Sequence, residues 1–193
     1  MKIFSQFRQK TGKLILLKYR KKRSRRKKTF NFKTVSRIGV LFDATNTNHF
    51  GPVYDFYKEL LKKNNRQVNL LGFVDGKQVP EKYLFKKNID IFTRKDVSYF
   101  YKPKSPDVIK FVNSEFDILF DLTMLDDIVI DFVGALSFSR FKVGRYFEGR
   151  NHLDLMVSMP DGLTIEYFIT QVVHYMERIN RPELVYKPFK RTL

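Results

Sequence analysis

Two groups of polar side chains that could perform acid–base chemistry or hold a metal follow two apolar segments of the chain. Asp43, Thr45 and Asn46 come directly after residues 38–42, and Asp121 and Thr123 lie at the end of residues 116–122. Carboxylates and hydroxyls at such places can bind a cation or move a proton. Aspartates after strands also cap helices and close turns, without any chemistry. These five residues are therefore a possible pocket, which the further polar residues Asn48, Asp126 and Asp127 would extend.

Basic side chains gather in the first 33 residues. The chain has 37 Lys and Arg against 20 Asp and Glu, a net charge of +17, and 14 of the basic residues precede residue 34, whereas no acidic residue precedes Asp43. The rest carries 23 basic and 20 acidic residues, a net charge of only +3. Such asymmetry points to a polyanionic partner, nucleic acid or an anionic membrane. The candidate RNA-binding residues here are Arg8, Lys10, Lys13, Lys18, Arg20, Lys21, Lys22, Arg23, Arg25, Arg26, Lys27 and Lys28.

A second basic cluster lies among aromatic residues near position 145. Arginine and aromatic side chains together can stack on unpaired bases and bind phosphates. Aromatic residues in strands are more often part of the core, so both interpretations stay open. The candidate RNA-binding residues of this cluster are Arg140, Lys142, Arg145 and Arg150.

Several classes of site find no support in the sequence. The chain has no Cys, which excludes disulfides, thiolate nucleophiles and Cys-based metal sites. Its three histidines, His49, His152 and His174, have no metal-binding spacing. The turn after residue 42 lacks the glycine pattern of dinucleotide-binding and Walker-type loops. No apolar run approaches the roughly 20 residues of a membrane span. We assign no cofactor, no catalytic residue and no small-molecule substrate, and expect a cytoplasmic protein.

Hydrophobic periodicity supplies the elements that would position these residues. Apolar runs predict strands at residues 38–42, 67–74, 89–92, 116–122, 141–144 and 153–158, with a short edge strand possible at 83–85. Amphipathic spacing predicts helices at residues 53–61, 105–113, 125–136 and 165–179. Strands that alternate with helices indicate an α/β, Rossmann-like domain, with a mostly parallel sheet of about five strands flanked by helices.

The predicted domain organisation has three parts. Residues 1–33 form a basic N-terminal arm, residues 34–180 the α/β domain, and residues 181–193 a tail without hydrophobic period. Part of residues 1–19 can be helical. Residues 20–28 contain eight basic residues in nine, so we expect this run to repel itself and to be disordered without a partner. A solvated tail and an organelle transit peptide are alternatives for the arm.

Two resemblances to known families carry expectations of their own. Residues 117–123 (DILFDLT) and 139–145 (SRFKVGR) resemble the middle of the N-terminal Rossmann-like domain of lipopolysaccharide heptosyltransferases. Over residues 38–180, the segments IGVLFD, FDILFDL and FKVGR resemble an uncharacterised family from Bacteroidetes-type bacteria. The first resemblance implies a Rossmann-like fold, and the second implies no reaction.

The sequence supports three hypotheses about function. The first is a non-enzymatic, ribosome-associated protein whose arm binds ribosomal RNA, with ribosomal proteins as further partners. The second is a glycosyltransferase-like or phosphoester-handling enzyme that uses Asp43 and Asp121. The third is a peripheral membrane protein that inserts residues 14–17 while its arm binds anionic lipid.

Overall fold

The computed structural model describes residues 2–63, 65–84, 89–150 and 152–179, and the predicted tail at 181–193 lies outside them. Six parallel strands form one sheet in the order β3-β2-β1-β4-β5-β6. The elements in chain order are α1 (Lys2–Lys21), β1 (Arg37–Asp43), η1 (Thr47–His49), α2 (Phe50–Leu61), β2 (Gln67–Val74), α3 (Glu81–Leu84), β3 (Ile89–Thr93), η2 (Arg94–Asp96), α4 (Pro106–Asn113), β4 (Ile118–Asp121), α5 (Ile128–Leu136), β5 (Phe141–Arg145), β6 (Leu155–Val157) and α6 (Ile165–Arg178).

The central strands are buried on both faces, as their uninterrupted apolar sequences predict. Every residue of β1 after Arg37 is buried, and so is every residue of β4. Val40 of β1 pairs with Leu70 of β2 on one side and with Phe120 of β4 on the other. Such strands occur where helices cover both faces of a sheet. The predicted α/β, Rossmann-like class is confirmed.

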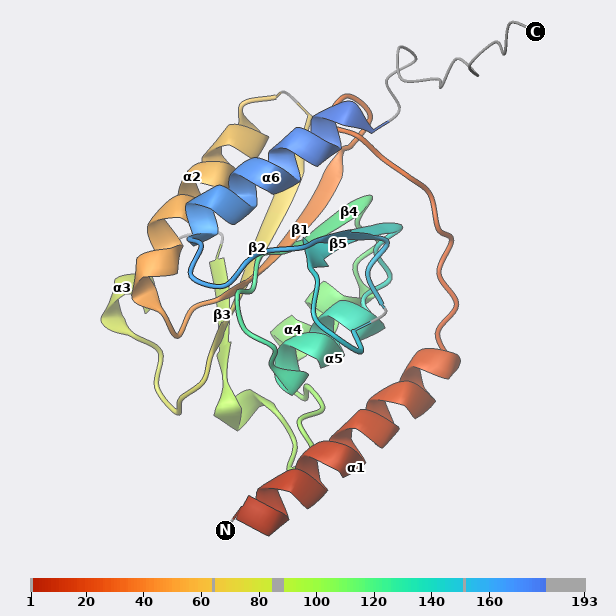
Figure 1. Cartoon of the computed structure of the whole chain (residues 1–193), viewed down its shortest axis with the longest axis vertical. Coiled ribbons are helices and arrows are strands. Elements are labelled where there is room, and N and C mark those ends of the chain that lie inside the picture. The colour runs from red at the N-terminus through yellow and green to blue at the C-terminus, as the bar shows by residue number, and fades with distance from the viewer. Residues whose placement is uncertain (1, 64, 85–88, 151, 180–193) are drawn as a thin grey trace, which may run out of the picture.

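Two helical layers cover the sheet. Figure 1 shows α2 and α6 on one face and α4 and α5 on the other. The first layer buries Val53, Phe56 and Phe168 in one hydrophobic cluster, and the second buries Val108 and Phe132 in another. Each helix turns its apolar stripe toward the sheet, so the layers follow from the helical periodicity of the sequence.

The N-terminal arm packs on the body of the protein. Helix α1 lies outside α5 and contacts it (Figure 1). Gly12 marks the closest approach, because a Cβ atom at this position would lie 2.9 Å from Ile128 Cδ1 and 3.1 Å from the Phe100 carbonyl oxygen. Ile15 and Leu16 pack against the cluster of the α4–α5 layer. The arm thus adds a third helix on this side of the sheet.

The expectation that residues 20–28 are disordered is wrong in this structure. Arg20 and Lys21 belong to the last turn of α1, and the chain beyond them runs along the body. Backbone carbonyls and one carboxylate of the body accept hydrogen bonds from Arg23 and Arg25, which offsets the repulsion within the run.

Two local predictions differ from the structure. Residues 83 and 84 of the possible edge strand at 83–85 belong to the short helix α3, and residue 85 lies outside the described residues. Tyr83 is buried in this helix and donates a hydrogen bond to the Ala44 carbonyl oxygen at 3.0 Å. The sheet has six strands where about five were expected, since the short β6 pairs in parallel with β5. The described residues of the connection between β5 and β6, 146–150 and 152–154, contain no helix.

Candidate functional site

A crevice lies at the carboxyl ends of β1 and β4, where the strand order reverses. This switch point is where doubly wound α/β proteins bind their ligands. The crevice has a volume of about 400 Å³. Of the five predicted pocket residues, four line it, namely Asp43, Thr45, Asn46 and Thr123, together with Asp75, Asp126 and Asp127. Asp121 is not part of its lining.

The polar residues after β1 hold a turn. Asp43 Oδ1 accepts a hydrogen bond from the Thr45 amide at 2.8 Å, and Thr45 Oγ1 accepts one from the Asp75 amide at 2.8 Å. Asn46 Oδ1 accepts one from the Asn48 amide at 3.1 Å at the start of η1. These bonds favour the structural interpretation of this group, in which the side chains satisfy backbone donors of the loop.

The crevice is acidic. Four aspartates line it, and Arg94 neutralises part of their charge, with its Nε 2.5 Å from Asp75 Oδ1 and its Nη2 3.1 Å from Asp127 Oδ2. Asp127 also caps α5, since its Oδ1 accepts a hydrogen bond from the Val129 amide at 2.7 Å. An acidic crevice repels phosphates, so it is a poor site for a nucleotide. The part of the chain that the structure describes contains no group of three His, Cys, Asp or Glu side chains arranged to hold a metal ion.

Asp121 is buried beneath the β5–β6 connection, where Arg150 meets three carboxylates. Arg150 Nη1 lies 3.0 Å from Asp121 Oδ2, and its Nη2 lies 3.3 Å from Asp126 Oδ1. Its Nε lies 2.7 Å from Asp131 Oδ1, without the alignment of a hydrogen bond. Asp121 Oδ1 accepts hydrogen bonds from Thr123. Asp43 and Asp121 therefore do not share the crevice as an acid–base pair.

The charge balance of this cluster favours the protonated form of one carboxyl group, that of Asp131, up to about pH 7. A single guanidinium cannot neutralise three buried or half-buried carboxylates. Burial raises the pKa of Asp131 to about 7, and the charges of Asp126 and Asp121 act in the same direction, against the lowering by Arg150. Burial also raises the pKa of Asp121, again opposed by Arg150.

The second basic cluster is mostly internal, and two of the predicted RNA-binding residues are buried. Lys142 is 1% exposed, and its Nζ donates hydrogen bonds to the carbonyl oxygens of Gly134 and Ala135 at 2.7 and 3.2 Å. Arg150 is 6% exposed and neutralises carboxylates. Neither side chain lies on the outer surface of the protein. Arg145 is also largely buried, and donates a hydrogen bond to the Met124 carbonyl oxygen at 2.7 Å.

Arg140 is the most exposed residue of this cluster. Its side chain is 40% exposed, and it lies 3.7 Å from Glu115 and 3.8 Å from Asp117. Only Arg140 among the four keeps a substantial surface for a partner.

Arginines attach the arm to the body. Arg8 Nε donates a hydrogen bond to the Tyr99 carbonyl oxygen at 2.5 Å, and its guanidinium lies over the Tyr101 ring. Arg23 Nη1 donates one to the Leu136 carbonyl oxygen at 2.5 Å. Arg25 Nη2 lies 2.7 Å from Asp154 Oδ1, with both side chains 13% exposed. The planar guanidinium suits such fixed contacts better than an ammonium group does.

The lysines of the arm are exposed. Lys27 approaches Asp154 at 3.3 Å but is 72% exposed, so its charge is still accessible. The exposed basic residues of the described arm are Lys10, Lys13, Lys18, Lys21, Lys22, Arg26, Lys27, Lys28 and Lys33. The arm thus separates its basic residues into arginines that contact the body and a row dominated by lysines that faces solvent.

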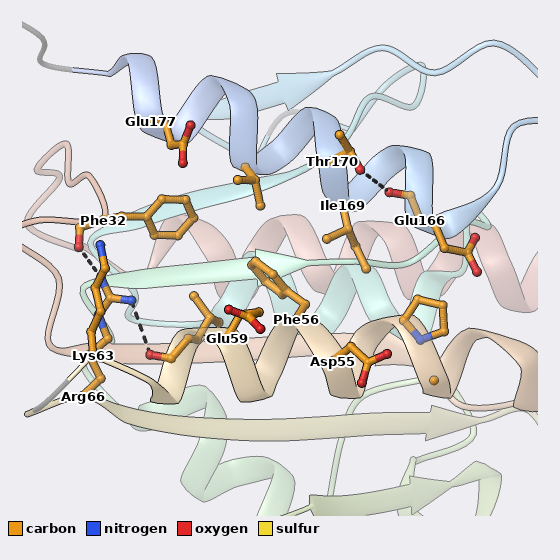
Figure 2. A pocket seen from close by; sticks show the side chains of 14 residues that line it. Phe32, Asp55, Phe56, Glu59, Lys63, Arg66, Glu166, Ile169, Thr170 and Glu177 are labelled. Atoms are coloured by element: carbon orange, nitrogen blue, oxygen red, sulfur yellow. Dashed lines mark hydrogen bonds between the residues drawn. The ribbon is translucent and has the colours of Figure 1, made fainter.

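A large apolar groove lies on the opposite face, between α2 and α6. It has a volume of about 740 Å³. In Figure 2, Phe56 and Ile169 point into it from the two helices, and the acidic side chains Asp55, Glu59, Glu166 and Glu177 lie along its edges. Arg66 closes one end, where it donates hydrogen bonds to the carbonyl oxygens of Leu60 and Phe32. The lining has four acidic side chains against the two basic side chains Lys63 and Arg66, which disfavours a polyanion inside the groove.

The sequence did not reveal this groove or the role of Arg94. The groove forms between helices that are about 100 residues apart in the chain, and its floor is the ordinary apolar stripe of each helix. Arg94 is a single arginine after β3, with no motif around it. Neither the groove nor the role of Arg94 can therefore be predicted from the spacing of residues along the chain.

The fold and these surfaces define a Rossmann-like, doubly wound α/β protein with a packed basic arm. No described helix is long and apolar enough to cross a membrane. The chain belongs to DUF6913, a family of unknown function whose model matches residues 8–179, so the match takes in most of the arm together with the sheet. No curated protein and no solved structure matches the chain.

Proposed function

We propose that this protein binds structured RNA through its N-terminal arm, without catalysing a reaction, and that this RNA is ribosomal RNA on the ribosome or an assembly precursor. The observation that carries the proposal is the exposed lysine row of the arm. The body fixes the arginines beside this row, so the charges are presented on an ordered surface rather than on a free tail.

The distribution of charge indicates which face of the protein would bind RNA. The arm lies on the α4–α5 layer, and the acidic groove lies on the α2–α6 layer. RNA would therefore lie along α1 and residues 22–28, with Arg140 nearby, since the Lys28 amide donates a hydrogen bond to the Arg140 carbonyl oxygen at 3.3 Å. Lysines that neutralise phosphates release counterions, so affinity should fall steeply with salt.

The first experiment is sedimentation of the tagged protein in a cell lysate at low and high salt. We expect co-migration with ribosomal particles at low salt and release at high salt. The test variant replaces Lys18, Lys21 and Lys22 by Gln, and the control replaces Lys58, Lys62 and Lys63, which lie on the exposed surface of α2 and just beyond it. Both variants lose the same charge, so net charge alone cannot separate them.

Binding to purified ribosomal RNA then quantifies the effect. Three lost phosphate contacts should lower the slope of log K against log salt by about 2 to 3 in the arm variant. The α2 control should keep the slope of the native protein. Equal loss in both variants would reduce the interaction to unspecific attraction, and no binding by the native protein would refute the proposal.

A second candidate function, binding to an anionic membrane surface, rests on the outer face of α1. Phe7, Leu14 and Leu17 are 64%, 67% and 45% exposed, and lysines lie among them. Exposed apolar side chains beside lysines are typical of helices that lie in a membrane interface. Ile15 and Leu16 face the body, so only Leu14 and Leu17 of the predicted inserting run are available. Flotation with anionic and neutral liposomes tests this function, and a protein that stays at the bottom of both gradients excludes it.

A further inference from the structure

A polar pocket lies where the arm crosses the ends of α5 and β5. We call it the arm pocket. Its volume is about 330 Å³, and its lining includes Arg20, Arg23, Arg25, Lys27, Lys142 and His152. No acidic side chain belongs to the lining. The nearest counter-charge in the contacts of Arg25 and Lys27 is Asp154, which forms ion pairs with both. The pocket therefore has a large excess of positive charge.

The cations of the arm pocket are held in place before any ligand arrives. Arg23 Nη1 and Nη2 donate hydrogen bonds to the Leu136 carbonyl oxygen and to Asn113 Oδ1, at 2.5 and 3.0 Å. Arg25 is fixed by Asp154 and by the Arg140 carbonyl oxygen at 2.8 Å. A guanidinium has five N–H donors, so these bonds position each arginine and leave further donors for an anion. Fixed donors lower the ordering cost of binding.

Lys142 supplies a buried ammonium to the same pocket. Its two hydrogen bonds go to the carbonyl oxygens at the end of α5, and an ammonium has a third N–H. Burial, together with the charges of Arg25, Arg20 and Arg23, lowers the pKa of Lys142 to about 7, with Asp154 acting in the opposite direction. A lysine in this setting lacks a full counter-charge. An anion in the pocket would provide it.

His152 adds a polar group that the protein leaves unsatisfied. It is 8% exposed, and its Nε2 has no hydrogen-bond partner within the described part of the chain. Burial lowers the pKa of His152 well below its usual value, with Arg150 and Lys142 acting in the same direction. The ring is therefore neutral and adds no charge of its own to the pocket, in which the arginines and lysines are the cations.

We propose that the arm pocket binds a phosphate group. Several fixed basic side chains around a small polar cavity are the arrangement that proteins use for phosphate oxygens. This inference rests on the proposed RNA binding in one respect. In the complex with RNA, the phosphate group in the arm pocket belongs to the RNA backbone. Free inorganic phosphate has the same recognition chemistry, so the experiment separates the two sources.

The test measures thermal unfolding of the full chain with increasing inorganic phosphate against chloride at matched ionic strength. Phosphate also stabilises proteins without binding, so variants provide the comparison. We expect a saturating rise of the unfolding temperature for the native protein. Lys142→Met should weaken phosphate binding about ten-fold or more, because a charge-assisted contact is lost. Lys62→Met, at an exposed position of the other layer, should leave the response unchanged.

A second variant keeps the test valid where Lys142→Met fails to fold. Ser24 is an exposed residue of the arm that lines the pocket, so Ser24→Glu adds a carboxylate at its edge without disturbing the core. It should abolish the saturating response. A response that is equal in the native protein and in Ser24→Glu overturns the phosphate site, and so does the absence of any saturating response.

RNA binding by the same proteins separates this inference from the proposed function. Phosphate binding that is lost in Ser24→Glu, together with weakened RNA binding, supports both. Phosphate binding without any RNA binding identifies a site for free phosphate and refutes the RNA function. RNA binding without a phosphate response refutes only the phosphate site.

Discussion

Arg150 Nη1 lies 3.0 Å from Asp121 Oδ2, and both side chains are almost completely buried. This contact joins the β5–β6 connection to the carboxyl end of β4. A parallel crossover usually contains a helix that covers the sheet, and the described residues of this one, 146–150 and 152–154, contain none. The ion pair holds this connection against the body together with the buried side chain of Leu153.

The first prediction concerns the removal of that arginine. Arg150→Met should lower the free energy of unfolding by about 3–5 kcal/mol, because it leaves the Asp121 carboxylate buried without a cation to neutralise it. Urea denaturation at pH 7 measures the change. The double variant Arg150→Met, Asp121→Asn should recover part of the loss, since the buried charge is then gone as well.

Arg140→Met is the matched control for this substitution. Arg140 is 40% exposed and its ion pairs are 3.7 and 3.8 Å long, so its loss should cost less than about 1 kcal/mol. Equal destabilisation by both variants would show that Arg150 does not stabilise the fold through burial of its ion pairs.

The sequence predicted most of the fold because the strongest signals are local. Residues 38–42 have the unbroken apolar character of a strand covered on both faces, and α2 and α6 have clear helical stripes. The arm was harder to predict, because its attachment depends on residues far away in the chain. Gly12 packs against Ile128 and the backbone at Phe100, and the sequence around Gly12 contains no motif that predicts this contact.

The second prediction tests how α1 is attached. Gly12→Leu raises helix propensity but places a large side chain where even a Cβ atom would be 2.9 Å from Ile128 Cδ1. We expect faster hydrogen exchange in α1 and greater proteolysis of the arm, with the sheet unchanged. Gln6→Leu adds the same side chain at an exposed position of the same helix and should change neither. Unchanged exchange in Gly12→Leu would contradict the packing of α1 on α5.

The third prediction concerns the proton on Asp131, whose pKa is raised from 3.8 to about 7. Between these values the folded protein binds more protons than the unfolded chain, so this group makes stability fall as pH rises, by up to about 1.4 kcal/mol per pH unit. Asp131→Asn, which mimics the protonated acid, should remove this slope. The variant should thus match the native protein near pH 4 and exceed its stability at pH 7.

Denaturation at a series of pH values measures the effect of Asp131→Asn. Asp126→Asn is the control, since the Asp126 side chain is 49% exposed and contacts the same arginine at 3.3 Å. A loss of stability in Asp131→Asn at pH 7 would mean that the Asp131 carboxylate is charged and stabilised by Arg150.

The candidate site was only partly predictable. The prediction that polar residues after neighbouring strands lie together was correct for four residues, because parallel strands end at the same edge of the sheet. These residues are Asp43, Thr45, Asn46 and Thr123. The same rule failed for Asp121, which a distant arginine covers. Residue type alone also cannot distinguish an exposed lysine from Lys142, whose burial depends on how the end of α5 packs against β5.

The last prediction concerns the carboxylate that holds the arm near the proposed phosphate site. Burial alone would raise the pKa of Asp154, but the hydrogen bonds and charge of Arg25 outweigh it, so the pKa is lowered below 3.8. Stability from this group is therefore present above pH 3.8 and is lost as pH falls below it. Asp154→Asn should cost about 1.5–3 kcal/mol at pH 7 and much less near pH 3.

Hydrogen exchange locates the effect of Asp154→Asn, and denaturation at the two pH values measures its size. Exchange should increase at residues 22–28, because Arg25 and Lys27 lose their charged partner. Asp161→Asn is the control, since Asp161 is fully exposed and its contact with Arg145 is 3.5 Å long. If residues 22–28 stay protected in Asp154→Asn, the backbone carbonyls that bind Arg23 and Arg25 suffice to hold the arm, and the lysine row stays ordered without this ion pair.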